Sequence, residues 1–321
     1  MRVVGLMPVR NESWVLRHSL RCLSGFCDVV LVSDQRSDDD SRAICREFPR
    51  VVLLESSESR VCEAARWQLL DAARSYDGGN LLWWSDADEL VSPRLARAWI
   101  EAQSGRLAQG TAIDCLFYHL WGRADRYRND RSMYRPHWKS IAFVDDRRMD
   151  YDRSLTLPLH EPRVAAVASA SSRAEGVPVF HLQWLLPERN QMKQAWYRCR
   201  ELMEGQKSAA EINRRYSIAL PAPRARTSPV PREWMEDVTF PDRAADREPS
   251  WQERDVLAWF DTYGAERFEP LELWHIPTLA REFQRRVRRR PRPDRSYLPP
   301  WPARVRRFAW RTARAALRTP F

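Results

Sequence analysis

Short apolar runs alternate with helix-like segments over the first ninety residues of the chain. The apolar runs cover residues 3–7, 29–32, 51–54 and 81–84. Each has the length of a strand that is buried on both faces. Between them, apolar residues recur every three or four positions over 14–23 and 59–75, which is the spacing of a helix with one buried face. The alternation predicts a doubly wound, mostly parallel α/β sheet of Rossmann-like type.

Polar residues follow three of these predicted strands. Residues 8–12 (PVRNE) follow the first, 33–39 (SDQRSDD) the second and 85–89 (SDADE) the fourth. Ligands of open α/β sheets bind outside the carboxyl ends of the strands, so these turns form the candidate site. Asp86 and Asp88 are expected on one side of the chain, where two carboxylates repel each other unless a cation lies between them. Mg²⁺ or Mn²⁺, which bind oxygen ligands and substrate phosphates, fit that position.

The three turns resemble, in order and spacing, those of family 2 glycosyltransferases of the GT-A fold. Within this family, the chain resembles bacterial enzymes that build the lipopolysaccharide core and other cell-surface polysaccharides. Residues 86–89 match the metal motif of the family, and 33–39 are similar to its Asp-Asp-Gly-Ser-Thr-Asp-Asp turn, with Ser33 and Gln35 departing from it. The resemblance implies a nucleotide-diphosphate-sugar donor, a Mn²⁺ or Mg²⁺ cofactor, and a glycan or lipid-linked acceptor.

The resemblance also implies roles for single residues. Asp34 would contact the base or ribose, and Arg66 the diphosphate or base, although Trp67 stands where the family has Asn. Asp88 would hold the cation together with Asp86, and His181 would be a further metal or diphosphate ligand. The implied nucleotide-sugar site comprises Pro8, Arg10, Glu12, Asp34, Arg66 and Asp86.

The middle of the chain is less regular. An apolar run over 113–121 predicts a strand, and the Arg-, Tyr- and Asp-rich residues 123–137 suit either a sugar-contacting loop or a solvated one. His160-Glu161 resembles an element of the lipopolysaccharide-core enzymes, which implies Glu161 as the general base on the acceptor hydroxyl. Asp130 and Asp146 are the reserve candidates. The family resemblance implies a single displacement with inversion.

The composition predicts three regions. Residues 1–205 are expected to form the glycosyltransferase domain, with a nucleotide-sugar half over about 1–110 and an acceptor half over about 111–205. Residues 206–280 contain six prolines between positions 221 and 249 and one helix-like segment, which predicts an extension. Residues 281–321 form a basic tail.

The tail carries the positive charge of the chain. It holds 14 Arg and two acidic residues, a formal +12 against +10 for the whole chain, so the rest is close to neutral. If residues 302–317 are helical, apolar side chains line one face and arginines the other, with Trp301 and Trp310 suited to a membrane interface. Such a helix predicts attachment of residues 281–321 to an anionic membrane surface. A solvated, disordered tail is the alternative, and nucleic-acid binding would leave the apolar face without a partner.

The compartment is predicted from cysteines and from apolar windows. The six cysteines include no Cys-x-x-Cys pair, which favours reduced thiols in the cytosol. The apolar stretch before Pro8 is too short for a signal peptide, and no window approaches the roughly 20 apolar residues of a membrane-spanning helix. A cytoplasmic enzyme bound peripherally to the inner face of the plasma membrane is therefore expected.

Other functions account for only part of the sequence. A sugar-phosphate nucleotidyltransferase has a similar fold, but its first turn is usually Gly-rich, and residues 8–12 contain no Gly. A nucleic-acid-binding protein would use the arginine tail and leave the acidic turns unexplained. A non-catalytic protein of the same fold remains an open alternative.

Overall fold

The computed structural model describes residues 1–56, 64–103, 105–151, 153, 163–164, 170–217, 225–242 and 250–298. The chain divides into two compact units. The first unit comprises Met1–Pro187 and Ala225–Arg247, and the second comprises Glu188–Arg224 and Glu248–Phe321. Residues 225–242, which were predicted within an extension, thus belong to the first unit. There Asp237 accepts hydrogen bonds from Ser92 Oγ (2.6 Å) and from the backbone N–H of Arg94 (2.7 Å).

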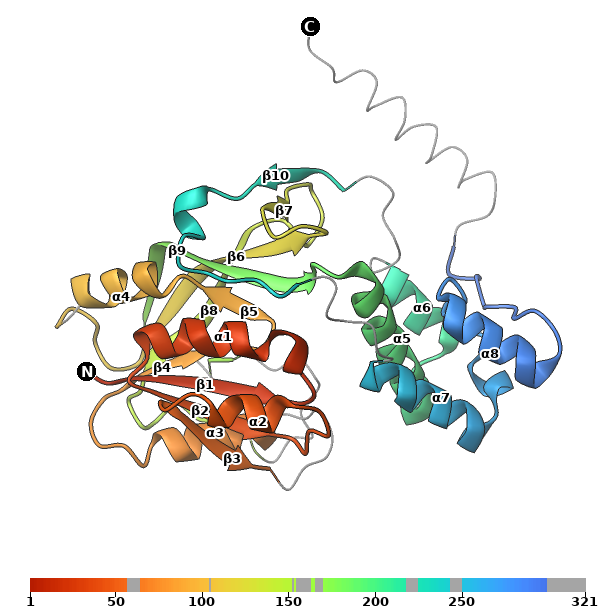
Figure 1. The fold of residues 1–321 in the computed structure, drawn as a ribbon, viewed down its shortest axis with the longest axis horizontal. Helices are drawn as coiled ribbons and strands as arrows, with labels where there is room; N and C mark the ends of the chain where they lie inside the picture. The colour runs from red at the N-terminus through yellow and green to blue at the C-terminus, as the bar shows by residue number, and fades with distance from the viewer. Residues whose placement is uncertain are drawn as a thin grey trace, which may run out of the picture. The chain divides into compact units, whose positions relative to one another are not determined.

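The first unit is built on one large sheet (Figure 1). Its strands are β1 (Val3–Val9), β2 (Val29–Asp34), β3 (Val51–Glu55), β4 (Leu81–Trp84), β5 (Glu89–Val91), β6 (Thr111–Trp121), β7 (Arg126–Arg128), β8 (His137–Val144), β9 (Ala170–Trp184) and β10 (Thr227–Pro229). The order is β10-β7-β6-β8-β4-β1-β2-β3, and β9 pairs with both β5 and β6. Its helices are α1 (Ser13–Phe26), α2 (Ser41–Arg46), α3 (Ala64–Ala73), α4 (Pro93–Ala102) and the short 3₁₀ helix η2 (Arg232–Trp234).

The N-terminal part of this sheet is parallel, as predicted. β1 pairs in parallel with β2 and with β4, and β2 pairs in parallel with β3. Successive strands step from β1 to β3, and the chain then returns across the sheet to β4. Because such crossovers are right-handed, the return places α3 on the face opposite α1 and α2. The predicted doubly wound α/β fold is confirmed, with antiparallel strands β8 and β7 added beyond β4.

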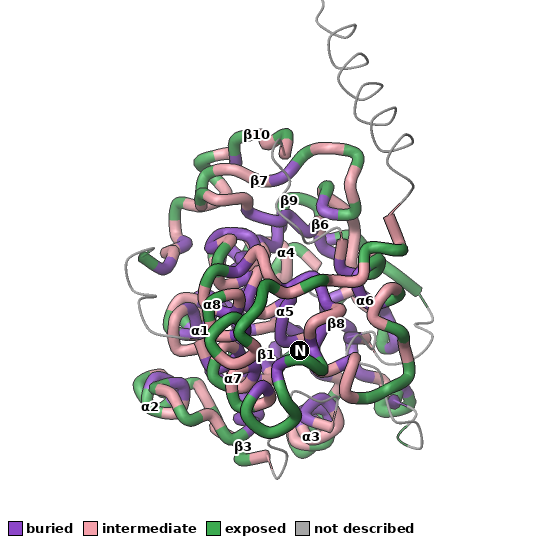
Figure 2. The backbone as a smooth tube through the Cα atoms, turned by 90° about the vertical axis from the view of Figure 1, so that its right-hand side faces the viewer, coloured by how far each residue is buried: buried purple, intermediate pink, exposed green. Residues whose placement is uncertain are grey.

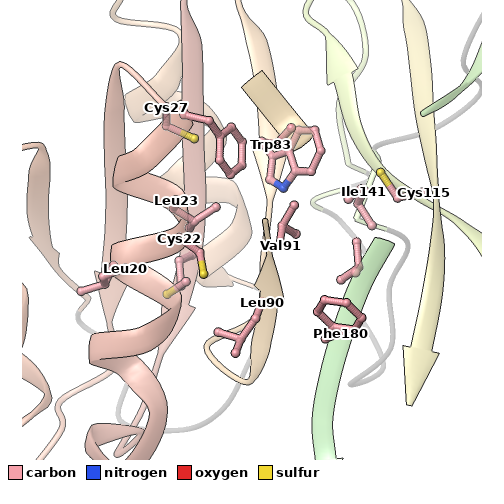
Figure 3. Close-up of a cluster of buried hydrophobic side chains, with 14 of the residues drawn as sticks. Leu20, Cys22, Leu23, Cys27, Trp83, Leu90, Val91, Cys115, Ile141 and Phe180 are labelled. Carbon is pink, nitrogen blue, oxygen red and sulfur yellow. The ribbon is translucent and has the colours of Figure 1, made fainter. Parts of the chain in front are cut away.

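Alternating side chains along the central strands supply the cores on the two faces. On one face, Trp83 packs with residues of α1 and with the edge of Phe26, whose ring centroid lies 5.0 Å away (Figure 3). On the other face, its neighbour Trp84 packs with Leu69 and Leu70 of α3. The period of two along a strand explains this division, since successive side chains point to opposite faces. Figure 2 shows that residues of the central strand β1 are mostly buried, whereas those of the edge strand β3 are more exposed.

The second unit is helical. It contains α5 (Pro187–Glu204), α6 (Ala209–Tyr216), α7 (Trp251–Tyr263), the 3₁₀ helix η4 (Ala265–Phe268) and α8 (Pro277–Val287). Ser208 and Glu211 form a capping box at the start of α6, and Ser250 caps α7. None of the described helices combines the length and the apolarity that crossing a membrane requires.

The basic segment before the C-terminus is ordered where the structure describes it. α8 continues to Val287, and its Phe283 is fully buried. Arg286 pairs with Asp261 (2.9 Å), Arg289 with Glu269, and Arg295 with Glu272 (2.6 Å). The alternative of a solvated, disordered tail therefore does not hold for residues 285–292, because acidic residues distant in the sequence pair with Arg286 and Arg289. Residues 299–321 lie outside the described residues.

The five described cysteines are free and buried. Burial raises the pKa of the Cys22 thiol to about 12, and a nearby Asp237 carboxylate adds to the shift. These thiols are therefore protonated near neutral pH and unreactive, as expected of packing residues. Cys62 is not among the described residues.

Asn213 provides a test of the second unit. Its side chain is fully buried and donates to the carbonyls of Pro270 and Asp294 (both 2.9 Å), while its Oδ1 accepts from the N–H of Glu272 (2.8 Å). We expect Asn213→Ala to lower the free energy of unfolding by about 2–4 kcal/mol, since three buried backbone groups lose a partner. Urea denaturation measures this loss. Asn129→Ala, which removes one exposed bond to Ser228, is the control and should change stability by less than about 1 kcal/mol.

Candidate functional site

One edge of the sheet collects most of the predicted site residues. The parallel strands β1, β2 and β4 all end there. β8 runs antiparallel to β4 and therefore begins at that edge, whereas β6 and β9 end there, with His119 opposite His181. Asp146 follows Val144, which pairs with Leu81 at the start of β4. The structure thus places Asp146 at the opposite edge and does not bring it to the site.

The turns after β1 and β2 are joined by side-chain hydrogen bonds. Asn11, whose φ is 54°, donates its N–H to Ser37 Oγ (2.9 Å) and accepts from the N–H of Asp38 through Oδ1 (2.8 Å). Glu12 N–H donates to Ser41 Oγ (3.0 Å). Asn tolerates this left-handed conformation better than most residues. The two turns, separated by some 25 residues in the sequence, therefore form one fixed surface.

Pro8, Arg10 and Glu12 contribute differently to that surface. Pro8 was expected in the turn, but it belongs to β1, which extends to Val9. Proline has no backbone N–H. At position 8 an N–H would point to the same side as the Leu6 carbonyl, towards β4, but β4 ends before this level, so the strand pairing does not need it. The Glu12 carboxylate accepts from Trp14 Nε1 (2.6 Å). Arg10 is half-buried at the end of the strand.

Asp34 ends β2 and is almost completely buried, with 1% of its surface exposed. Its Oδ2 accepts from Arg42 Nε (2.5 Å) and from the N–H of Ser37 (3.2 Å). Its Oδ1 is buried and has no hydrogen-bond partner among the described residues. A buried carboxylate oxygen without a donor is unfavourable, so a ligand donor at this position would stabilise it.

Asp86 lies among positive charges. Its Oδ2 accepts from Arg163 Nη2 (2.5 Å), and Arg66 Nη2 of α3 lies 4.0 Å from its Oδ1. Desolvation by surrounding protein would raise the pKa of Asp86, but the charges of Arg163, Arg66 and Lys139 outweigh it and lower that pKa to about 2. The cation that balances Asp86 in this structure is a guanidinium, which sequence patterns did not predict.

Arg163 joins Asp86 to Glu89. Its Nη1 donates to Glu89 Oε2 (2.6 Å) and its Nη2 to Glu89 Oε1, and the same Glu89 Oε2 accepts from the N–H of Asp86 (3.0 Å). Arg163 is 5% exposed and Glu89 is 2% exposed. The opposing carboxylates raise the pKa of Arg163 above its usual value despite its burial. Arg163 and Glu89 thus form a buried ion pair, which extends to the partly exposed carboxylate of Asp86.

Asp88 faces a histidine pair instead. Its Oδ2 lies 3.4 Å from His181 Nε2, and His181 Nδ1 lies 3.1 Å from His119 Nδ1. Burial lowers the pKa of His119 to about 2, and the neighbouring His181 and His137 add to the shift. His119 is therefore neutral at physiological pH. The contact between His119 and His181 could not be predicted from the sequence, because only the pairing of β6 with β9 brings the two residues together.

The described residues contain no group of three His, Cys, Asp or Glu side chains that could hold a metal ion. Asp88 and His181 nevertheless present two ligand atoms at a separation compatible with neighbouring positions around one ion. Mg²⁺ and Mn²⁺ commonly take only one or two protein ligands and complete their shell with waters and substrate phosphates. Asp88 and His181 thus fit a cation that also binds a diphosphate. The Asp86 carboxylate faces Arg163 and Arg66 instead.

Asp130 lies further along the same edge of the sheet. Its Oδ2 accepts from Arg128 Nε (2.9 Å), and Arg128 lies over the rings of Trp121 (4.3 Å) and Tyr134 (5.2 Å). The Tyr134 ring also contacts His119, with centroids 5.2 Å apart. Asp130 is therefore engaged in a polar and aromatic cluster beside the histidines. The predicted base Glu161 and its neighbour His160 lie outside the described residues.

Comparison with known sequences identifies one family. Residues 6–158 match the family described as "Glycosyl transferase family 2". This stretch contains all three turns of the site, from Pro8 to Glu89. No curated protein matched the sequence closely enough to count as a relative.

Comparison with solved structures finds distant likenesses. A chain of S. aureus TarS is 12% identical with a TM-score of 0.40, over 68% of this chain and 43% of that chain. S. aureus TarS 1–349 in complex with UDP-GlcNAc is 12% identical with a TM-score of 0.38, over 90% of this chain and 89% of that one. Glucosyl-3-phosphoglycerate synthase from M. tuberculosis, in complex with Mn²⁺, UDP and glucosyl-3-phosphoglycerate, is 15% identical with a TM-score of 0.27, over 36% and 44%. The chain spans less than half the length of the first of these.

Proposed function

We propose that this chain, whose residues 6–158 match the family described as "Glycosyl transferase family 2", transfers a sugar from a nucleotide-diphosphate sugar to a glycan or lipid-linked acceptor. The transfer depends on Mn²⁺ or Mg²⁺ and inverts the anomeric centre. The enzyme serves the synthesis of a cell-surface polysaccharide. A sugar-phosphate nucleotidyltransferase is not favoured, because the turn at residues 8–12 offers no Gly-rich cradle for a triphosphate.

The buried, unpartnered Oδ1 of Asp34 carries the proposal for the nucleotide. It lies at the carboxyl end of β2, beside the joined turns after β1 and β2. A base N–H or a ribose hydroxyl would donate to it and satisfy the carboxylate. The ion pair with Arg42 keeps the other oxygen fixed, so Asp34 is oriented before the ligand binds. Arg10 and Glu12 then border the nucleotide from the turn after β1.

The acidic turn after β4 would receive the diphosphate. A bound divalent cation supplies charge neutralisation of the leaving diphosphate, and Asp88 and His181 are the residues that would hold it. Arg66 lies beside Asp86 and over the Trp84 ring (5.7 Å), which fixes its guanidinium towards the same edge. Arg66 would therefore contribute positive charge where negative charge develops.

The acceptor hydroxyl needs a base on the far side of the sugar ring. Glu161 is proposed for this role, and Asp130 remains the reserve, because it lies at the same edge of the sheet as His119 and Tyr134. Removal of the hydroxyl proton by one carboxylate, with the donor diphosphate leaving on the opposite side, inverts the anomeric carbon.

We predict that Asp88→Ala abolishes turnover of the nucleotide-sugar donor and leaves the fold intact. The side chain lies at the sheet edge, where its loss removes a cation ligand without opening the core. Donor hydrolysis in the presence of Mn²⁺ measures turnover, and circular dichroism measures folding. Asp77→Ala, at an exposed aspartate ahead of β4, is the control. Turnover near the wild-type rate in the Asp88 variant rules out its role in holding the cation.

We predict that Glu161→Gln keeps donor binding and loses transfer by about 10²–10⁴-fold, because the amide cannot accept the proton. Donor binding is followed by calorimetry and transfer by release of the nucleoside diphosphate. Asp146→Asn, which changes a carboxylate at the opposite edge of the sheet, should behave as wild type. If Glu161→Gln retains its rate while Asp130→Asn loses it, then Asp130 is the base.

We predict that residues 299–321 attach the enzyme to an anionic membrane surface. These residues hold six Arg and no acidic residue, and each basic residue near such a surface contributes about 1 kcal/mol. The test is flotation with anionic vesicles, comparing the full chain with a version that ends at Leu298, which retains the ion pairs of Arg286, Arg289 and Arg295. The full chain should float at low salt and the shortened one should not. Equal flotation of both excludes this attachment.

A further inference from the structure

We propose that Arg163 is a positioning residue with two effects on the transfer reaction. It fixes the acidic turn after β4 by binding both Asp86 and Glu89. It also neutralises Asp86 and Glu89, so that a cation is held by Asp88 and His181. This inference rests on the proposed function, which assigns Asp88 and His181 as cation ligands.

The hydrogen bonds of Arg163 support the first effect. The two nitrogens at the end of its guanidinium bind both oxygens of Glu89 and one oxygen of Asp86. A planar guanidinium can do this in one orientation, whereas a lysine ammonium cannot span both carboxylates in the same way. Glu89 itself begins β5 and binds the backbone of Asp86, so the carboxylates that receive Arg163 are already fixed.

The charges support the second effect. Three carboxylates lie within residues 86–89, and both Asp88 and Glu89 are more than nine-tenths buried. Arg163 contacts Asp86 and Glu89, while the Oδ2 of Asp88 faces His181 (3.4 Å). The guanidinium thus removes two of the three negative charges from competition for a cation. Changing Arg163 or Glu89 should then alter cation affinity in opposite directions.

A second buried pair offers a matched control for an ordinary structural role. Arg74 donates to both oxygens of Asp145 (2.8 Å from Nη2 to Oδ1 and 3.1 Å from Nε to Oδ2) and to the carbonyl of Met149. Asp145 directly follows β8, at the edge opposite the site. Arg74 and Arg163 therefore make similar contacts, but Arg163 binds the acidic turn after β4, whereas Arg74 binds at the opposite edge.

The first experiment compares Arg163→Lys with Arg74→Lys. Turnover is the release of nucleoside diphosphate from the donor with Mn²⁺ present. For Arg163→Lys we expect kcat to fall by about tenfold or more, because small displacements of groups around the reacting atoms lower the rate. The KM for the donor should change by less than about threefold. Arg74→Lys should keep both constants. Wild-type kcat in Arg163→Lys overturns the positioning role.

The second experiment measures Mn²⁺ binding by electron paramagnetic resonance without nucleotide. Arg163→Met should tighten Mn²⁺ binding by about tenfold, and Glu89→Gln should weaken it by about tenfold, because one unit charge is gained or lost nearby. The double variant Arg163→Met/Glu89→Gln should bind Mn²⁺ with the wild-type affinity, because it removes one positive and one negative charge. It buries no unpaired charge at these two positions, so it still tests the charge role if Arg163→Met fails to fold. Weakened binding in the double variant, or in both single variants, overturns the charge role. A wild-type protein that binds neither Mn²⁺ nor any nucleotide sugar refutes the proposed function itself.

Discussion

The site depends on the parallel pairing of β1 with both β2 and β4. Parallel strands end at a common edge, so turns that are far apart in the sequence meet there. In the order β4-β1-β2, the strands are added in one direction from β1 to β3, and β4 is then added on the other side of β1. At this topological switch point, the crossover helices on the two sides lie on opposite faces of the sheet and leave a place for a ligand. Asp34 and Asp86 reach the same edge for this reason. The remaining strands extend the edge with His119 and His181.

The balance of charge at that edge determines what it can bind. Buried carboxylates are tolerated because Arg42 pairs with Asp34, and Arg163 pairs with Asp86 and Glu89. Each pair fixes a side chain and removes a charge from solvent. Among the described residues, the unpartnered Oδ1 of Asp34 and the carboxylate of Asp88, which faces His181, lie at this edge. Their chemistry suits a hydrogen-bond donor and a cation, the two features of a metal-bound nucleotide diphosphate.

The sequence predicted the first ninety residues well because their strands are continuous apolar runs, and polar turns mark where the strands end. It could not predict partners that only the tertiary fold brings together. Arg163 meets Asp86 from a segment some 75 residues away, and His119 meets His181 across two paired strands. Asp146 was misplaced because apolar periodicity does not reveal strand direction, and β8 is antiparallel. The ion pairs of the basic segment were not predicted, because the acidic partners of its arginines, such as Asp261, lie on other elements.

We propose that the edge formed by β1, β2 and β4 binds a nucleotide-diphosphate sugar together with a divalent cation. The most direct measurement is thermal unfolding of the full chain with UDP-, GDP- and dTDP-sugars, each with and without Mn²⁺. A ligand that binds only the folded protein raises the melting temperature. One nucleotide class should raise it, more with Mn²⁺ than without, and Asp34→Asn should remove the increase. If no nucleotide sugar shifts the melting temperature at millimolar concentration, this edge does not bind such a donor.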